Sequence, residues 1–145
     1  MANRIQLTGT YFLEEGEADG VVSPGMLLEL QSTGKVKAFD TEGAVAERAF
    51  AVENALAGGT VDDDYADGDM VQYHLVAPGS DIQAILSAGE KVVKGDRLVP
   101  SNDGSLIKLG SQASASEANV IAVAREAKDL SASTAVSTLI KVRVL

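Results

Sequence analysis

The sequence predicts an all-β fold: a small, internally duplicated β-barrel or β-sandwich with an extended N-terminal arm and at most short helical turns. Three observations support this prediction. Runs of strand length recur between turns rich in glycine, of which the chain has 14 in 145 residues. One pattern of glycine and leucine occurs twice along the chain. Hydrophobic residues make up 46% of the sequence and aromatic residues only 4%, so the core must consist of Val, Ile, Leu and Ala.

Residues 1–20 are predicted to form an arm that precedes a single β domain at residues 21–145. The arm alternates apolar with polar residues at Ile5 and Leu7 and holds two of the six aromatic residues. A segment of this kind can add a strand to the sheet of a partner, or it can form an edge strand of its own barrel. We expect the partner to be contacted by Ile5, Leu7, Tyr11, Phe12 and Leu13. Deleting Met1–Leu13 is expected to leave the domain folded.

The domain itself is predicted to contain short strands separated by turns. The apolar runs that predict strands are Val21–Val22, Met26–Leu30, Val71–Val76, Lys91–Val93, Leu98–Val99, Leu106–Leu109, Val120–Ala124 and Leu139–Leu145. Turns are expected where glycine supplies a positive φ and Asp holds the turn backbone. The structural turn residues are Gly25, Gly34, Gly95, Asp96 and Gly104.

A repeat divides the domain into two related halves, at about residues 21–77 and 90–145. When Gly25 is set against Gly95, the pattern G-x-x-L-x5-G-x-(V/L) occurs in both halves. Small shifts then align two further segments, Phe50–Val52 with Ile121–Val123 and Met70–Val76 with Leu139–Leu145. Four elements in the same order predict a duplication.

Segment Asp40–Leu56 fits either a helix or a strand, because it is rich in good helix formers while its partner in the repeat mixes Ala with β-branched residues. We predict a strand over Ala49–Glu53 after a short helical turn near Ala44. Another helical turn is allowed within Ser116–Lys128, and Ser111–Glu117 is predicted to be a polar, mobile loop.

The alternation of apolar residues predicts a core, and the largely buried residues are expected to be Leu28, Val36, Val52, Val71, Leu75, Leu98, Leu106, Val123, Ile140, Val142 and Val144. The single histidine, His74, stands in the alternating run Q-Y-H-L-V and is interpreted as an exposed strand residue.

No enzyme activity, cofactor or metal is predicted. The chain has no Cys and one His, so one chain cannot supply a thiolate site or a two-histidine metal site. The acidic run Asp62–Asp69 lacks the ligand spacing of an EF-hand. We interpret it as a solvated acidic loop, with a bound cation as the alternative.

Charge argues against two classes of partner. The chain has 12 Lys and Arg against 21 Asp and Glu, a formal net charge of -9. Nucleic acid and anionic membranes both require a basic surface, so neither is expected as a partner. Met1–Gly20 lacks the apolar stretch of a signal peptide, and we expect the protein to fold in a cytoplasm.

The motif Val93-Lys94-Gly95-Asp96-Arg97-Leu98 resembles the turns of lipoyl and biotinyl carrier domains, which are also duplicated β-structures. The segment that would carry the modified lysine, Gln31–Val36, lacks the acidic or methionine neighbours that a carrier requires. The motif is therefore interpreted as a structural turn, and a carrier domain remains an alternative function.

Three further parts of the chain combine turns with strands: Glu53–Asp69 followed by Val71, Ala88–Pro100 leading into Asp103–Leu106, and Ile121–Ala124 with Ile140–Leu145. Together they resemble small capsid decoration, or cement, proteins of tailed bacteriophages. The resemblance covers about Val21–Leu145 and rests on turns and strands alone.

This resemblance implies an all-β domain of the β-tulip type, often a homotrimer, on the outer surface of an icosahedral head. Its partner would be the major capsid protein, and the protein would stabilise contacts between capsid subunits. It would be assembled into the virion in the host cytoplasm. Another structural protein of a phage head or tail is the alternative within this class.

Overall fold

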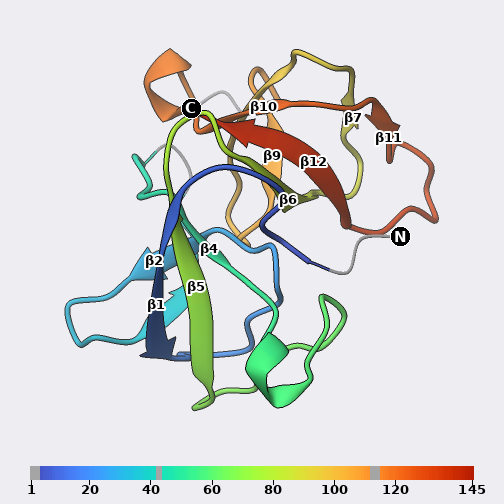
Figure 1. The fold of residues 1–145 in the computed structure, drawn as a ribbon. Helices are drawn as coiled ribbons and strands as arrows, with labels where there is room; N and C mark the ends of the chain where they lie inside the picture. The colour runs from blue at the N-terminus through green and yellow to red at the C-terminus, as the bar shows by residue number, and fades with distance from the viewer. Residues whose placement is uncertain (1–3, 42–43, 112–114) are drawn as a thin grey trace.

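The computed structural model describes residues 4–41, 44–111 and 115–145, and its regular structure is almost entirely β (Figure 1). The predicted all-β fold is confirmed. The strands are β1 (Tyr11–Glu17), β2 (Leu28–Leu30), β3 (Val36–Ala38), β4 (Ala49–Ala51), β5 (Met70–Val76), β6 (Asp81–Leu86), β7 (Lys91–Val92), β8 (Arg97–Pro100), β9 (Leu106–Lys108), β10 (Ala122–Ala124), β11 (Lys128–Asp129) and β12 (Thr138–Val144). Two short 3-10 helices, η1 (Ala55–Ala57) and η2 (Glu117–Asn119), complete the elements.

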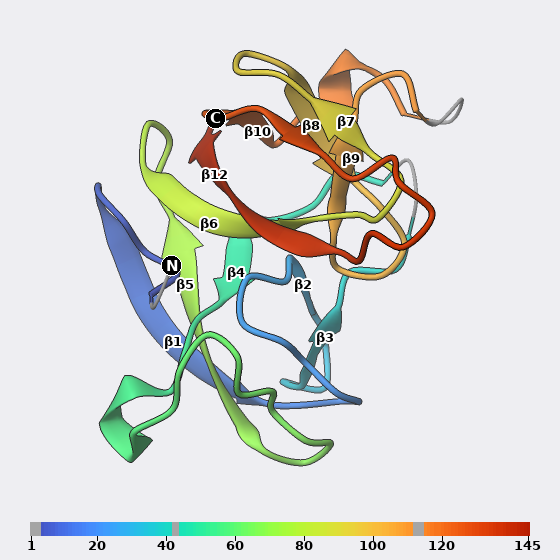
Figure 2. The ribbon, with the colours of Figure 1, turned by 90° about the vertical axis from the view of Figure 1, so that its right-hand side faces the viewer.

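The strands form a closed barrel and a set of smaller sheets. The barrel has the order β10-β12-β6-β9-β8, and the three-stranded sheet has the order β1-β5-β4. Two further pairs, β2-β3 and β7-β11, lie beside these sheets. The barrel occupies one end of the molecule and the three-stranded sheet with β2-β3 the other (Figures 1 and 2).

The pairing of the strands repeats along the chain. In the β2-β3 hairpin, Leu28 lies opposite Ala38. In the β8-β9 hairpin, Leu98 lies opposite Lys108. Both members of the second pair follow those of the first by 70 residues (28 to 98 and 38 to 108), which is the offset that the sequence repeat predicts.

The last strands of the two halves pair in the same way. Ala49 of β4 lies opposite Leu75 of β5, and Ala122 of β10 lies opposite Val144 of β12. The pairing therefore sets Phe50 against Val123, whereas the sequence alignment set Phe50 against Ile121. This difference of two residues leaves the inward and outward pattern of a strand unchanged, so the hydrophobic pattern does not detect it.

The first strand of each half was not predicted. Glu14 of β1 lies opposite Tyr73 of β5, and Ile82 of β6 lies opposite Val142 of β12 in the equivalent pair. The sequences of β1 and β6, YFLEEGE and DIQAIL, share little. A likeness in pairing without a likeness in sequence explains why the repeat was seen only from Gly25 onward.

When β1 and β6 are taken as the first strands, the two halves span residues 11–76 and 81–144. The sequence analysis placed them at about 21–77 and 90–145. The halves thus include residues 11–20 of the predicted arm and residues 81–89, which lay between the two predicted halves.

The arm prediction must be corrected, because residues 4–17 belong to the folded domain. Ile5 is fully buried in the larger core cluster, and Leu7 is half-buried. Residues 11–17 form β1 at the edge of a sheet of this chain, which was the alternative to a partner strand. The expectation that Met1–Leu13 can be removed without loss of the fold is not compatible with this burial.

Two core clusters fill the molecule, and nine of the predicted core residues are buried in them. Leu75 and Val123 are only half-buried. Val123 lies on the outer face of the barrel, opposite Arg143 and Arg97, and Leu75 lies opposite the exposed Phe12. Val123 therefore stands on a solvent-facing side, whereas Leu75 shares a strand face with Val71 and Tyr73 and packs at the margin of the smaller core cluster.

Segment Asp40–Leu56 contains the predicted strand as β4, followed by η1. The helical turn expected near Ala44 falls partly on residues 42–43, which lie outside the described residues. The mobile loop expected at Ser111–Glu117 falls partly on residues 112–114, which also lie outside them. The helical turn allowed after Ser116 is present as η2. No helix in the described part of the chain is long and apolar enough to cross a membrane.

Candidate functional site

The candidate site is the outer edge of β1, which presents three consecutive large apolar side chains to solvent. Tyr11 is 43% exposed, Phe12 72% and Leu13 55%. Glu14 and Glu15, also exposed, follow them directly. We call these five residues the β1 edge. Successive side chains of a strand point to opposite faces, so Phe12 stands on one face and Tyr11 and Leu13 on the other. Exposed apolar side chains on both faces of an edge strand make it a candidate contact surface.

Pairing with β5 holds the β1 edge in an extended conformation. Leu13 lies opposite His74, and Glu15 lies opposite Gln72. In the order β1-β5-β4, β1 is the end strand, so its other side carries no ladder within the described residues. Figure 2 shows β1 along the outside of the molecule.

The side chains behind β1 are tightly arranged around His74. The Tyr11 ring stacks on the His74 ring with centroids 3.7 Å apart and an interplanar angle of 5°. His74 Nδ1 donates to Gln6 Oε1 over 3.0 Å. The prediction of an exposed His74 is wrong, since the side chain is 8% exposed beneath β1 and the N-terminal segment. Burial lowers its pKa to about 4, so the ring is neutral at pH 7.

The acidic part of the β1 edge is ordered by neutral donors. Glu14 accepts a hydrogen bond from the Tyr73 hydroxyl over 2.9 Å, and Glu15 accepts one from Gln72 Nε2 over 3.1 Å. Burial, together with the nearby Glu14 carboxylate, raises the pKa of Tyr73 to about 12. Among the described residues, no Lys or Arg forms an ion pair with Glu14 or Glu15. The edge therefore presents uncompensated negative charge beside apolar surface.

A shallow hollow adjoins Phe12. It is lined by Phe12, Glu47, Arg48, Leu75, Val76, Ala77 and Pro78. The lining is largely apolar, so the hollow continues the apolar surface of the β1 edge onto the end of β5.

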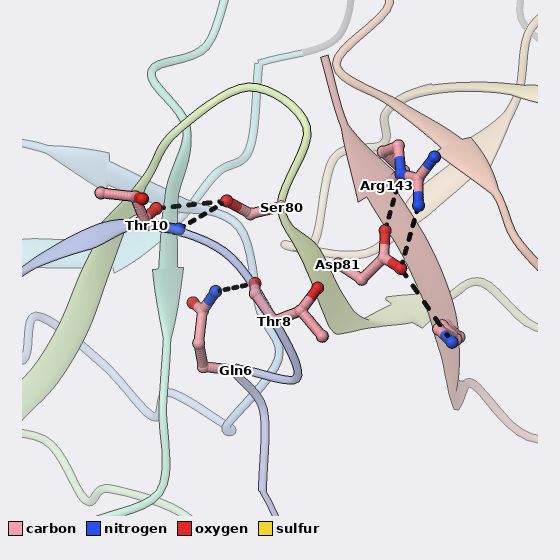
Figure 3. A network of polar contacts seen from close by, with 7 residues as sticks. Gln6, Thr8, Thr10, Ser80, Asp81 and Arg143 are labelled. Atoms are coloured by element: carbon pink, nitrogen blue, oxygen red, sulfur yellow. Dashed lines mark hydrogen bonds and ion pairs between the residues drawn. The ribbon is translucent and has the colours of Figure 1, made fainter.

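The chain leading into β1 is anchored to the β5–β6 turn (Figure 3). The Thr10 amide donates to Ser80 Oγ over 3.0 Å, and Ser80 Oγ donates to the Thr10 carbonyl over 3.2 Å. Next to this contact, Asp81 accepts from Arg143 Nε over 2.9 Å and from Nη2 over 3.3 Å. The pKa of Asp81 is lowered, mainly by these bonds to Arg143.

The five predicted contact residues are thus divided by the structure. Tyr11, Phe12 and Leu13 lie together on the β1 edge, whereas Ile5 is in the core and Leu7 is half-buried. Sequence reasoning did not include Glu14 and Glu15. Their signal was the E-E pair directly after an apolar triplet, which was interpreted only as part of the predicted arm at residues 1–20.

The residues predicted as turns are not part of the β1 edge. Gly25, Gly34, Gly95 and Gly104 have φ values of 94°, 89°, 99° and 82°. Asp96 accepts from the Val93 amide over 2.9 Å.

Lys35, the candidate for a carrier modification, follows the β2–β3 turn, and its Nζ lies 3.5 Å from a Glu17 carboxylate oxygen.

The carboxylates of the acidic loop are engaged with the backbone. Asp63 accepts from the Thr60 amide over 2.7 Å, and Asp69 accepts from the Ala66 amide over 2.8 Å. Asp67 accepts from the Gly20 amide over 2.8 Å. No group of three or more His, Asp or Glu side chains within the described residues is arranged to hold a metal ion.

Fold and site together define an all-β domain of two equivalent halves with an exposed, apolar and acidic strand edge. Such a domain is similar to a solved phage structure, the N base of the head fiber gp8.5 in bacteriophage phi29. The TM-score is 0.59, with 16% sequence identity over 94% of this chain and 95% of that chain. At this identity the likeness concerns the fold. No protein-family model matches the chain, and no curated protein matches it significantly.

Proposed function

We propose that this protein is a structural protein of a phage head, and specifically a decoration or cement protein on the outer surface of the capsid. The observation that carries the proposal is the fold likeness to a head-fiber base along nearly the whole chain. The sequence resemblance to decoration proteins supports it independently, because it rests on strands and turns of both halves. Catalysis and cofactors form no part of the proposed function.

The proposed mechanism is binding linked to particle stability. A protein that binds only the assembled shell stabilises that shell by mass action. Many copies on one particle add avidity, so each contact needs only modest affinity. The proposed partner is the major capsid protein, and the proposed contact surface is the β1 edge with its neighbouring hollow.

We further propose that the protein acts as a homotrimer on the capsid exterior. Three copies joined in one unit would present three β1 edges to neighbouring capsid subunits, which is the arrangement that avidity requires. Sedimentation velocity of the full chain tests this state directly. A monomer at micromolar concentration would contradict it.

The binding test uses phage heads assembled without this protein. Full-length protein is expected to sediment with such heads, and the variant Phe12→Ala/Leu13→Ala is expected to bind about tenfold more weakly or worse, because central apolar contacts dominate interface energies. Val136→Ala is the matched control, since Val136 is 71% exposed and lies outside the β1 edge.

The possible results test the role on the capsid and the role of the β1 edge separately. Absence of binding by the full-length protein would contradict a role on the capsid. Equal binding by wild type and the double variant would remove the β1 edge from the mechanism.

A second candidate, the base of a head fiber, is favoured by the description of the similar structure. Electron microscopy of decorated heads distinguishes the two. A cement protein gives compact surface knobs, and a fiber base gives knobs from which a fiber projects when the rest of the fiber is present.

A further inference from the structure

The edge of β6 that is equivalent to the free edge of β1 is covered by other segments of this chain, by β9 at Leu86 and by residues 5–8 at the beginning of the strand. Residues 5–8 run antiparallel along it, with Gln6 opposite Ile82. The Leu7 and Thr8 amides donate to the Asp81 carbonyl over 3.0 and 3.1 Å. The Gln83 amide donates to the Ile5 carbonyl over 2.8 Å.

The repeat identifies the matching backbone groups on β1. Equivalent residues of β1 and β6 are 68 positions apart, as Glu14 and Ile82 are (14 to 82). Asp81 and Gln83 therefore correspond to Leu13 and Glu15.

The end of β1 confirms which amides point outward. The Ala18 amide donates to Asp69 beside β5, whereas the next amide, Asp19, donates away from β5 to Val36. Because outward groups alternate along a strand, those of Leu13 and Glu15 also point away from β5. Among the described residues, no backbone group pairs with them.

We propose that the β1 edge is a strand-acceptor site, which an extended segment of a partner protein carrying basic and apolar side chains joins antiparallel to β1. The backbone of Leu13 and Glu15 would bind the segment as Asp81 and Gln83 bind residues 5–8. This inference goes beyond the proposed function, because it holds for any partner with such a segment.

Charge and exposure define the occupant. Glu14 and Glu15 lack a cationic partner within the described residues, so a lysine or arginine on the incoming strand would be favoured. Tyr11, Phe12 and Leu13 offer apolar contact beside them. The segment that already occupies the equivalent edge, Arg4-Ile5-Gln6-Leu7-Thr8, has one basic and two apolar residues.

A second copy of β1 is a poor occupant. Antiparallel pairing of β1 with itself would bring the Glu14, Glu15 and Glu17 carboxylates of both copies to one edge, and exposed charges on an edge strand oppose such pairing. The N-terminal segment of the chain is also unsuitable, because Ile5 would have to leave the core.

The test is an NMR titration of the isotope-labelled full chain with a synthetic peptide. The probe has the sequence of residues 2–9 with Gln6→Lys and Thr8→Lys, and the control peptide carries Glu at both positions. The lysine peptide is expected to shift the amide signals of Leu13 and Glu15 and to slow their hydrogen exchange. The glutamate peptide is expected to bind several-fold more weakly, and added salt should reduce the difference.

Two variants separate backbone pairing from side-chain contact. Leu13→Pro removes an outward amide without touching the β5 ladder, a place where edge strands tolerate proline. Leu13→Ala removes the same side chain but keeps the amide. We expect Leu13→Pro to abolish peptide binding and Leu13→Ala to retain it within a few-fold. If Leu13→Pro does not fold, a peptide N-methylated at alternate residues carries the same test on wild-type protein.

Three results would overturn the inference: no peptide binding, equal binding by the two Leu13 variants, or signal changes at Asp81 and Gln83 in place of Leu13 and Glu15. The last would show that the peptide replaces residues 5–8 on β6. A protein that binds the peptide but not phage heads would keep this inference and contradict the proposed function, and the reverse result would do the opposite.

Discussion

The two halves of the molecule share one pattern of strand pairing and use it differently. In the second half, Ile82 and Val142 face each other inside a closed, apolar barrel. In the first half, the same two positions are the exposed Glu14 and the buried Tyr73, which are joined by a hydrogen bond. A repeated backbone ladder thus pairs two core residues in one half and a core residue with a surface carboxylate in the other.

The edges differ in the same way. The outer edge of β6 is covered by residues 5–8, while that of β1 is open. The equivalent cross-strand pairs also differ. Asp81 of β6 forms an ion pair with Arg143 of β12, whereas Leu13 of β1 forms none with His74 of β5. Strand topology therefore determines which half can receive a partner, because β6 has neighbours on both sides in the closed barrel and β1 is the end strand of its sheet.

Removing the covering segment from β6 is expected to have the largest effect. Deletion of Met1–Thr8 takes Ile5 out of the core and uncovers the β6 edge. Loss of a buried Ile side chain alone costs about 2–5 kcal/mol of unfolding free energy, so the deletion should cost at least that much. Denaturant unfolding of the deletion, of Ile5→Ala and of the exposed control Val136→Ala measures it. An unchanged midpoint for the deletion would mean that residues 1–8 form a free arm after all.

An intermediate effect is expected at a pair of equivalent glycines. Gly25 and Gly95 both have left-handed φ, so replacing either with Ala brings a similar backbone strain of about 1–2 kcal/mol. A Cβ on Gly25 would lie 2.4 Å from Leu139 Cδ2, whereas one on Gly95 meets nothing within 4 Å. Gly25→Ala should therefore cost about 1–3 kcal/mol more than Gly95→Ala, as overpacking does. Equal thermal stability of the two variants would show that the halves do not meet at Gly25.

The remaining effect concerns pH, and it distinguishes His74 from its counterpart Arg143, which stays charged. The pKa of His74 is about 4 in the folded chain and near 6.5 when unfolded, so between these values the unfolded chain binds the extra proton. The contribution of His74 to the free energy of unfolding should therefore be constant above pH 6.5. It should fall as pH decreases toward 4, by at most about 1.4 kcal/mol per pH unit. The His74→Gln variant should show a smaller change in the free energy of unfolding over this pH range.

Asp81 affects the pH dependence of stability only at lower pH. The pKa of Asp81 is lowered by Arg143, so its contribution is lost as pH falls below about 4. A wild-type stability that does not change between pH 6.5 and 4.5 would contradict the burial of His74 under β1.

The sequence predicted the fold class and the hairpin offset, because glycine turns and apolar alternation are local signals. It did not predict β1 and β6 as equivalent strands, since Glu14 and Ile82 have nothing in common as side chains. The burial of Ile5 and His74 was missed for a related reason. Each is covered by a segment far away in sequence, and no local pattern records that contact.

The site was predicted in part. Tyr11, Phe12 and Leu13 were identified as contact residues from their place in an apolar segment, and the structure exposes all three. Ile5 and Leu7 belonged to the same pattern, but Ile5 lies in the core and Leu7 is half-buried. The pattern of alternation gives the faces of a strand, but not which sheet will cover them.

Amide hydrogen exchange at two equivalent residues tests the central difference between the halves most directly. The Gln83 amide donates to Ile5 and should exchange only when the domain opens, whereas the Glu15 amide points to solvent and should exchange at nearly the rate of an unfolded peptide. We expect their protection to differ by several orders of magnitude in the free protein. Similar protection of both amides would contradict an edge that is covered on β6 and open on β1.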